Sequence, residues 1–158
     1  SFTGVRIGLA VVKAIGQARE IPGLGVSSLE ALAYSFKGCA RSVAAMLDAR
    51  RDQIFGAVYS WTDGVAQVQV KEQVSEPGAW LKRIPTQVNP LFVGSGAVAC
   101  RDLIRMSHPP GRLLAEQPPL LSALIRLAAS RAGQARPVAE IQANYIRPSG
   151  ARMGRRGS

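Results

Sequence analysis

The chain has 158 residues, of which 47% are apolar, 19% charged and 6% aromatic, and it carries a net charge of +10. This composition predicts one packed domain and excludes a disordered chain, while two cysteines and one histidine exclude a disulfide framework or a four-ligand zinc site. No apolar run reaches the roughly 18 residues of a membrane-spanning helix, and free thiols without a secretory signal predict a reducing cytoplasm.

The first predicted element is a helix from Val5 to about Ala18, with Thr3 as its N-cap. Glycine and alanine recur along this helix, so another backbone could approach it closely. The spacing predicts that four residues share one face: Val5, Leu9, Val12 and Gly16. Because the chain opens at Ser1 without a methionine and runs straight into this helix, we expect the C-terminal part of a longer protein.

A second helix follows, and after it come three consecutive strands and further short elements. Ser27 or Ser28 caps the helix at 29–36, and Asp63-Gly64 is typical of a two-residue hairpin turn. Apolar runs predict the other elements: strands at 24–26, 43–47, 54–61, 65–70, 91–93 and 112–114, and helices at 79–81, 97–106 and 120–131. In the last helix we expect four residues to face inward: Leu121, Leu124, Ile125 and Ala128.

The order of these elements predicts an α/β fold. Three consecutive strands, then helix, strand, helix, is typical of a ribonuclease H-like unit. Two such units form the architecture of the actin-like and sugar-kinase superfamily.

The lone histidine and the two cysteines are weak catalytic candidates. His108 lies in a Pro- and Gly-containing loop with no neighbouring carboxylate or thiol, so we expect it to face solvent. Cys39 and Cys100 have no adjacent histidine, and we interpret them as small packing residues.

A phosphate contact is possible at two turns. Gly94-Ser95-Gly96 follows a strand and precedes a helix, although an ordinary strand-to-helix turn explains it better. Asp48 begins a turn that also holds Arg50 and Arg51, so a salt-bridged hairpin competes with a metal or phosphate contact there. Glu30 and Asp48 would form an acid/base pair only if the fold brought them together.

The positive charge is mostly scattered, which favours a solvated surface over a dense RNA-binding patch. No series of aromatic residues lies between the bases to stack nucleotides. The densest basic segment is the end of the chain, where proximity to RNA remains an alternative for Arg152, Arg155 and Arg156.

Five segments carry a resemblance to a known family. The opening S-F-T-G-V-R-I-G, then G-V-S-S-L-E-A-L at 25–32, D-A-R at 48–50, V-G-S-G at 93–96 and N-Y-I-R-P at 144–148 occur in one order. In that order they resemble the signatures of the TsaB (YeaZ) family, which is glycoprotease-like (Gcp-like). The resemblance implies an actin-like fold whose first lobe is incomplete. It divides the chain into the remainder of an N-terminal lobe (1–37), a C-terminal ribonuclease H-like lobe (38–147) and a basic, disordered tail (148–158).

The resemblance implies a non-catalytic scaffold. Its partners would be a TsaD-type subunit, which transfers threonylcarbamoyl to the adenosine next to the tRNA anticodon, and a TsaE-type ATPase. A homodimer is also possible, tRNA would be bound indirectly, and no cofactor is expected on this chain alone. Ser28 and Leu32 occupy the positions of the two TsaD-type metal-ligating histidines, so no metal site is expected there. The implied partner interface lies on the first helix: Gly4, Val5, Gly8, Leu9, Val12 and Gly16.

Three alternatives remain open at this point. The first helix could instead pack within the monomer. The chain could be a degenerate glycoprotease-like hydrolase or an actin-like ATPase that uses Asp48 and the 94–96 turn. It could also be a basic RNA-binding module, which the charge alone favours.

Overall fold

The computed structural model describes residues 2–109, 112–116 and 118–146, so the expectations for the basic tail and for Arg152, Arg155 and Arg156 lie outside the described residues. A mixed five-stranded sheet forms the centre of the molecule, in the order β3-β2-β1-β4-β5. Its strands are β1 (Ser42–Arg50), β2 (Gln53–Thr62), β3 (Val65–Ser75), β4 (Leu91–Val93) and β5 (Arg112–Leu114).

The strand pairing is that of a ribonuclease H-like unit. β1, β2 and β3 form an antiparallel meander, and β4 and β5 add to the other side of β1 in parallel. β1 is buried along most of its length because helices cover both faces of the sheet. The α/β prediction is confirmed in its element order and topology.

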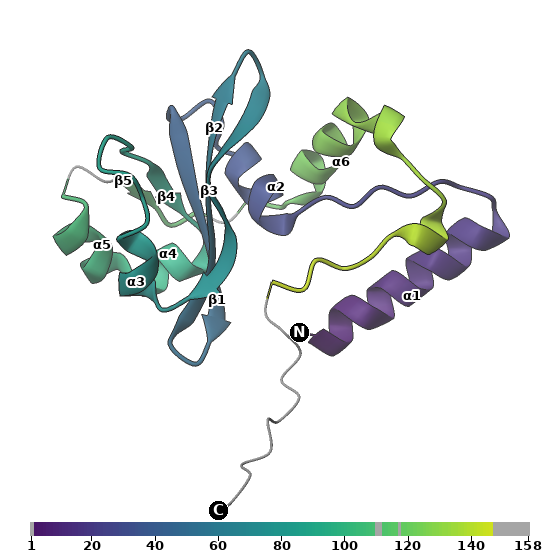
Figure 1. Cartoon of the computed structure of the whole chain (residues 1–158), viewed down its shortest axis with the longest axis horizontal. Helices are drawn as coiled ribbons and strands as arrows, with labels where there is room; N and C mark the ends of the chain where they lie inside the picture. Colours follow the sequence, from purple (N-terminus) through teal and green to yellow (C-terminus); the bar gives the residue numbers. More distant parts are fainter. Residues whose placement is uncertain (1, 110–111, 117, 147–158) are drawn as a thin grey trace, which may run out of the picture.

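One face of the sheet is covered by α3 (Pro77–Leu81), α4 (Ser95–Ala99) and α5 (Arg101–Ser107), as Figure 1 shows. Trp80 and Phe92 are completely buried in the core between these helices and the sheet. The predicted helix at 97–106 is divided, because the backbone at Cys100 leaves the helical conformation, with ψ of 21° and φ of −106°.

The other face holds α2 (Ser28–Tyr34), with α6 (Leu121–Ser130) outside it. Leu29 and Leu32 of α2 pack against β1 and β2. The predicted inward face of α6 is wrong in part: Ala123 and Leu127 are buried, whereas Leu121 is 68% and Ile125 is 59% exposed. The helix α6 packs on α2 through a narrow contact, in which Ala123 and Leu127 meet Ala31.

The helix α1 (Phe2–Ala18) lies apart from the sheet, beside the short 3₁₀ helix η2 (Val138–Glu140), whereas the 3₁₀ helix η1 (Ala132–Gln134) directly follows α6. It begins one residue before Thr3, so Thr3 lies inside the helix and is not its N-cap. The strand predicted at 24–26 is also wrong. This connection instead forms an isolated antiparallel bridge between Gly23 and Arg136, and Gly23 packs close to Val138 and Ile141.

Candidate functional site

The helix α1 is held by a small contact with η2. Gly16 is its buried residue, and a Cβ at this position would lie 2.8 Å from Val138 Cγ1. The Lys13 ammonium donates a hydrogen bond of 2.7 Å to the carbonyl oxygen of Ala139. Glycine at position 16 thus allows η2 to approach the helix closely.

Most of the apolar surface of α1 remains exposed. Its large apolar side chains are at least half exposed: Val5 50%, Ile7 62%, Val11 53%, Val12 57% and Ile15 57%. Gly8 lies among them, and a Cβ added there would meet no atom within 4 Å. We call the surface formed by Val5, Ile7, Gly8, Val11, Val12 and Ile15 the free face of α1.

The free face overlaps only partly with the predicted partner interface. Val5, Gly8 and Val12 lie on it, and Gly4 is exposed in the first turn of the helix, but Leu9 is half-buried and Gly16 packs against the chain's own η2. Gly16 is therefore not available to a partner in this structure. Sequence reasoning missed three residues at intervals of four, a spacing that does indicate one side of a helix: Ile7, Val11 and Ile15.

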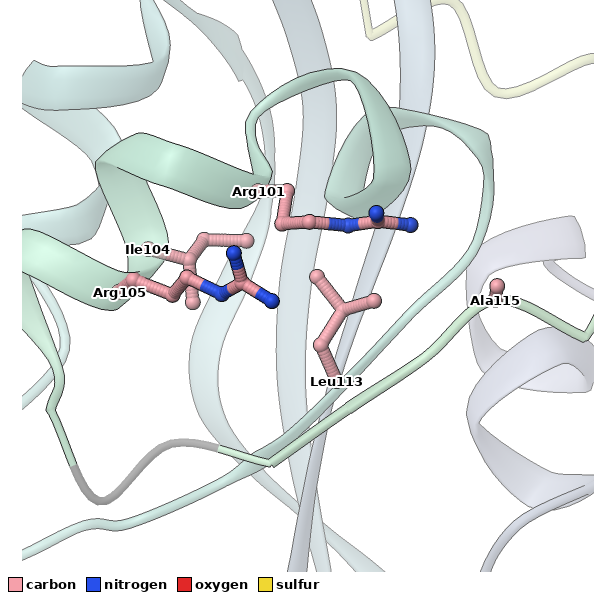
Figure 2. A pocket seen from close by; sticks show the side chains of 5 residues that line it. All are labelled: Arg101, Ile104, Arg105, Leu113 and Ala115. Carbon is pink, nitrogen blue, oxygen red and sulfur yellow. The ribbon is translucent and has the colours of Figure 1, made fainter.

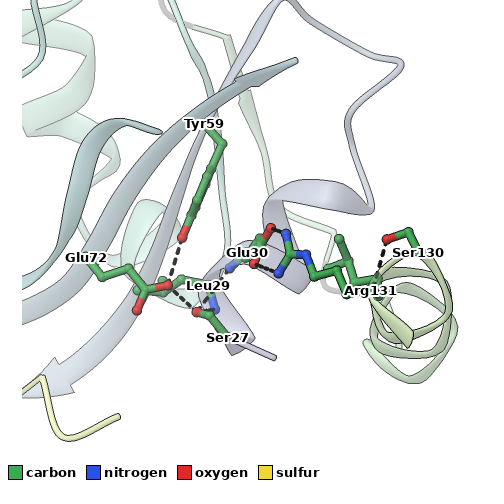
Figure 3. A network of polar contacts seen from close by, with 8 residues as sticks. Ser27, Leu29, Glu30, Tyr59, Glu72, Ser130 and Arg131 are labelled. Carbon is green, nitrogen blue, oxygen red and sulfur yellow. Dashed lines mark hydrogen bonds and ion pairs between the residues drawn. The ribbon is translucent and has the colours of Figure 1, made fainter. Parts of the chain in front are cut away.

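A polar junction fixes the start of α2 to the sheet (Figure 3). The Ser27 hydroxyl caps α2 by accepting a bond of 3.1 Å from the Leu29 amide, and it donates a hydrogen bond to Glu72 on β3. Glu72 also accepts bonds from the Tyr59 hydroxyl at 2.7 Å and from the Asn144 side chain at 2.8 Å. This one carboxylate therefore joins α2, two strands and the C-terminal segment that carries η2.

Burial and the bond to Glu72 raise the pKa of Tyr59 far above its ordinary range, so its phenol remains a hydrogen-bond donor. Glu72 is not among the residues predicted from the sequence, since it lies in a polar part of β3 outside the five family-like segments. Ser27 and Asn144 do lie in two of those segments, and both side chains bind Glu72.

An ion pair joins α2 to the end of α6. Arg131 donates two hydrogen bonds to the carboxylate of Glu30, one of them 2.9 Å long (Figure 3). The Glu30 side chain is 11% exposed and that of Arg131 is 29% exposed. The bond to Glu30 raises the pKa of Arg131. Glu30 thus has a structural partner, and Asp48 has a different one, described next.

The Asp48 turn and the 94–96 turn do lie together, because β1 and β4 are neighbours. Ser95 Oγ accepts a hydrogen bond of 3.1 Å from the Asp48 amide. Gly94 has a φ of 97°, and a Cβ there would lie 2.3 Å from the Met46 carbonyl oxygen. The Asp48 carboxylate accepts a bond of 2.7 Å from the Arg50 amide. The turns are thus packed on each other, and a phosphate contact there stays a prediction.

The positions aligned with metal-ligating histidines play different parts in the fold. Ser28 is the exposed first residue of α2, and Leu32 is 2% exposed in the core. Across residues 2–109, 112–116 and 118–146, no three histidine, cysteine or acidic side chains gather where a metal ion could bind.

The predicted solvent-facing position of His108 is wrong. It is half-buried at the end of α5, and its ring meets that of Phe92 edge-on at a centroid distance of 5.4 Å. This burial lowers the pKa of His108. Burial raises the pKa of the Cys100 thiol, which packs against the core, whereas Cys39 is exposed.

Comparisons with known proteins now define the class and the family. A family model described as "TsaD: tRNA N6-adenosine threonylcarbamoyltransferase" matches residues 1–148. Two solved structures from Pseudomonas aeruginosa share the fold. One, described as an uncharacterized protein with similarity to peptidase YEAZ, has a TM-score of 0.73 at 30% identity, covering 93% of this chain and 69% of that one. The other, YeaZ, has a TM-score of 0.67 at 29% identity, covering 89% and 66%.

Two curated relatives are both called tRNA threonylcarbamoyladenosine biosynthesis protein TsaB. The Bacillus subtilis (strain 168) protein is 34% identical over 95 residues, which are 60% of this chain and 42% of that protein. The Escherichia coli (strain K12) protein is 35% identical over 80 residues, which are 49% of this chain and 35% of that protein. The matched region thus spans less than half of each curated relative.

The fold and these matches define an α/β protein of the actin-like ATPase superfamily with a Gcp-like domain. Within that class, the chain belongs to the TsaB (YeaZ) family. The resemblance drawn from the sequence is confirmed. Among the described residues, no helix combines the length and apolar character needed to cross a bilayer.

Proposed function

We propose that this chain is a partner subunit in the biosynthesis of threonylcarbamoyladenosine in tRNA. It docks onto a TsaD-type transferase and supports that subunit without performing the transfer. A TsaE-type ATPase joins the same complex. The names of the two curated TsaB relatives support the pathway, and the features of α1 support the docking role.

The free face of α1 is the observation that carries this proposal. Five large apolar side chains, each at least half exposed, lie on one helix together with Gly4 and Gly8. A contiguous exposed apolar surface of this kind often marks a site where a protein binds a partner. The two glycines keep the helix slim, so a helix of the partner could pack close to its backbone.

The chain's own contacts hold α1 in a defined place while leaving its free face open. Gly16 and Lys13 attach the helix to η2, and Asn144, a few residues beyond η2, is bound to Glu72 of the sheet. The helix is therefore presented by the folded lobe. The binding cost of ordering it is reduced accordingly.

The candidate reactive groups serve the fold, which supports a non-catalytic role. Asp48 is bound to Arg50, the Cys100 thiol is stabilised in its neutral form by burial, and His108 packs on Phe92. We expect the purified chain alone neither to modify tRNA nor to turn over nucleotide. Turnover by the isolated chain would overturn this part of the proposal.

The docking role is tested with Gly8→Leu. No atom lies within 4 Å of a Cβ at this position, so the variant should fold normally yet obstruct close approach of a partner helix. Overpacking a contact costs about 1–3 kcal/mol, which predicts a Kd for the TsaD-type subunit roughly 5- to 150-fold weaker.

Ala10→Leu is the matched control for this experiment. It adds a side chain of the same size two residues away, about 200° around the helix, on an exposed position outside the free face. We expect its Kd to stay within about twofold of the original, since less than 0.5 kcal/mol is typical of a surface change. Unchanged binding in a folded Gly8→Leu variant would reject α1 as the docking site.

The same free face would allow two copies of the chain to pair when the transferase subunit is absent. Self-association, measured by sedimentation, should then weaken in Gly8→Leu and persist in Ala10→Leu. Competition between the two assemblies is expected, because both would use the free face of α1.

A further inference from the structure

A hollow of about 300 Å³ lies between α5 and β5, at the edge of the sheet (Figure 2). Ile104, Leu113 and Ala115 form its apolar part, and Ile104 is almost completely buried. Arg101 and Arg105 complete the lining, and Figure 2 shows both guanidinium groups directed toward β5. The hollow thus combines an apolar floor with two permanent positive charges.

These arginines are available to an external anion. Within the described ranges, no carboxylate is paired with Arg101. Arg105 lies 3.8 Å from Asp102, but these side chains are 72% and 92% exposed, so water screens the pair. Two guanidinium groups one helical turn apart repel each other, and a bound anion would relieve that repulsion.

A second hollow of about 210 Å³ lies at the starts of β1, β4 and β5. Arg41 and Arg112 line it, and neither has a side-chain partner within the described part of the chain. Arg112 lines this hollow and its neighbour Leu113 lines the first, so both hollows border β5. Arg101, Arg105 and Arg112 therefore border the edge strand β5, and Arg41 lies just before β1, two strands away.

We propose that the β5 edge, together with Arg41, binds the phosphate backbone of RNA, and that the hollow at Arg101 and Arg105 is the principal contact. Arginine holds phosphate oxygens through two parallel hydrogen bonds, and the apolar floor fits a ribose or the face of a base. Repeated charge along an edge matches a polyanion better than one small anion. The inference deepens the proposed function, on which it rests, by giving this chain a direct contact with tRNA.

The position of this edge suits a ternary complex. Figure 1 shows β5 and α5 at one end of the molecule and α1 at the other. A partner on the free face of α1 would leave the β5 edge open. Each contact is therefore separately testable.

The test measures binding of an unmodified tRNA transcript to the full chain by fluorescence anisotropy over a salt series. The variant is Arg101→Gln with Arg105→Gln. The charge-matched control is Arg19→Gln with Arg126→Gln, two exposed arginines that line neither hollow. We expect about tenfold or greater loss of affinity in the first variant and less than about threefold in the control. Loss of two phosphate contacts should also reduce the salt slope by about 1.4.

The variant Asp102→Asn should change the affinity for tRNA in the opposite direction. Removing this carboxylate beside Arg105 should strengthen tRNA binding about two- to threefold, a result that misfolding could not produce. Equal losses in the two double variants would overturn the inference, because they would mean non-specific charge attraction. Equally tight, arginine-dependent binding of polyglutamate would overturn it in favour of an acidic protein partner.

Association with the TsaD-type subunit is measured on the same variants. Retained association with lost tRNA binding in the Arg101/Arg105 variant supports both proposals. A chain that binds tRNA through this edge but never binds the transferase subunit would contradict the proposed function and leave the RNA contact standing.

Discussion

The helices α1 and α2 come from the same short stretch of sequence but are stabilised in different ways. α2 has 7 residues, of which five are buried between the sheet and α6. α1 has 17 residues and is exposed almost throughout. A helix as short as α2 is marginal in water and depends on packing, whereas α1 has enough length for its own hydrogen bonds to matter. α2 therefore supports the fold, and α1 presents a surface.

The largest difference is expected between matched truncations on the two helices. Leu32→Ala should lower the free energy of unfolding by about 2–5 kcal/mol, because Leu32 is 2% exposed between α2 and the sheet. Val11→Ala, at a residue that is 53% exposed, should change it by less than about 0.5 kcal/mol. Urea denaturation of both variants measures the difference, and similar losses would contradict the contrast between the helices.

A smaller effect is expected from the ion pair that joins α2 to α6. Glu30→Gln leaves the Arg131 charge without its partner in a half-buried position and should cost about 1–3 kcal/mol. Arg131→Gln should add little once Glu30 is replaced, which a double-mutant cycle measures. The exposed pair Asp102–Arg105 is the control, for which the cycle should give less than about 0.5 kcal/mol of coupling.

The smallest effect concerns pH. Burial lowers the pKa of His108 below its ordinary value of 6.5, so the unfolded chain takes up the proton first as the pH falls. The contribution of His108 to the free energy of unfolding is therefore complete above pH 6.5. It is lost as the pH falls toward the pKa that His108 has in the folded chain. The free energy of unfolding of the part of the chain that holds the sheet should fall slightly between pH 7 and 5.5, whereas α1 contains no histidine.

The single histidine gives one resolvable ring signal for an NMR titration. A midpoint at or above 6.5 would contradict the half-buried position of the ring. In His108→Gln the pH dependence over this window should flatten. A slope that persists unchanged would point to another group.

Local sequence patterns predicted the strands of the sheet well, but they predicted the contacts between distant segments poorly. The apolar runs and the Asp63-Gly64 turn predicted the meander, because strands and hairpins depend on neighbouring residues. The family-like segments predicted α1 as an interface helix. The spacing of its residues could not reveal that Gly16 packs against Val138, which lies 122 residues further along the chain. Glu72 had no local signal, since its importance comes from three partners that only the fold brings together.

Amide hydrogen exchange, compared between the free chain and its mixture with a TsaD-type subunit, is the most direct test of docking through α1. We predict that amides of α1 (Phe2–Ala18) exchange more slowly in the mixture, while those of α5 (Arg101–Ser107) at the far end do not change. A complex that forms while the exchange of α1 stays the same would contradict the central claim.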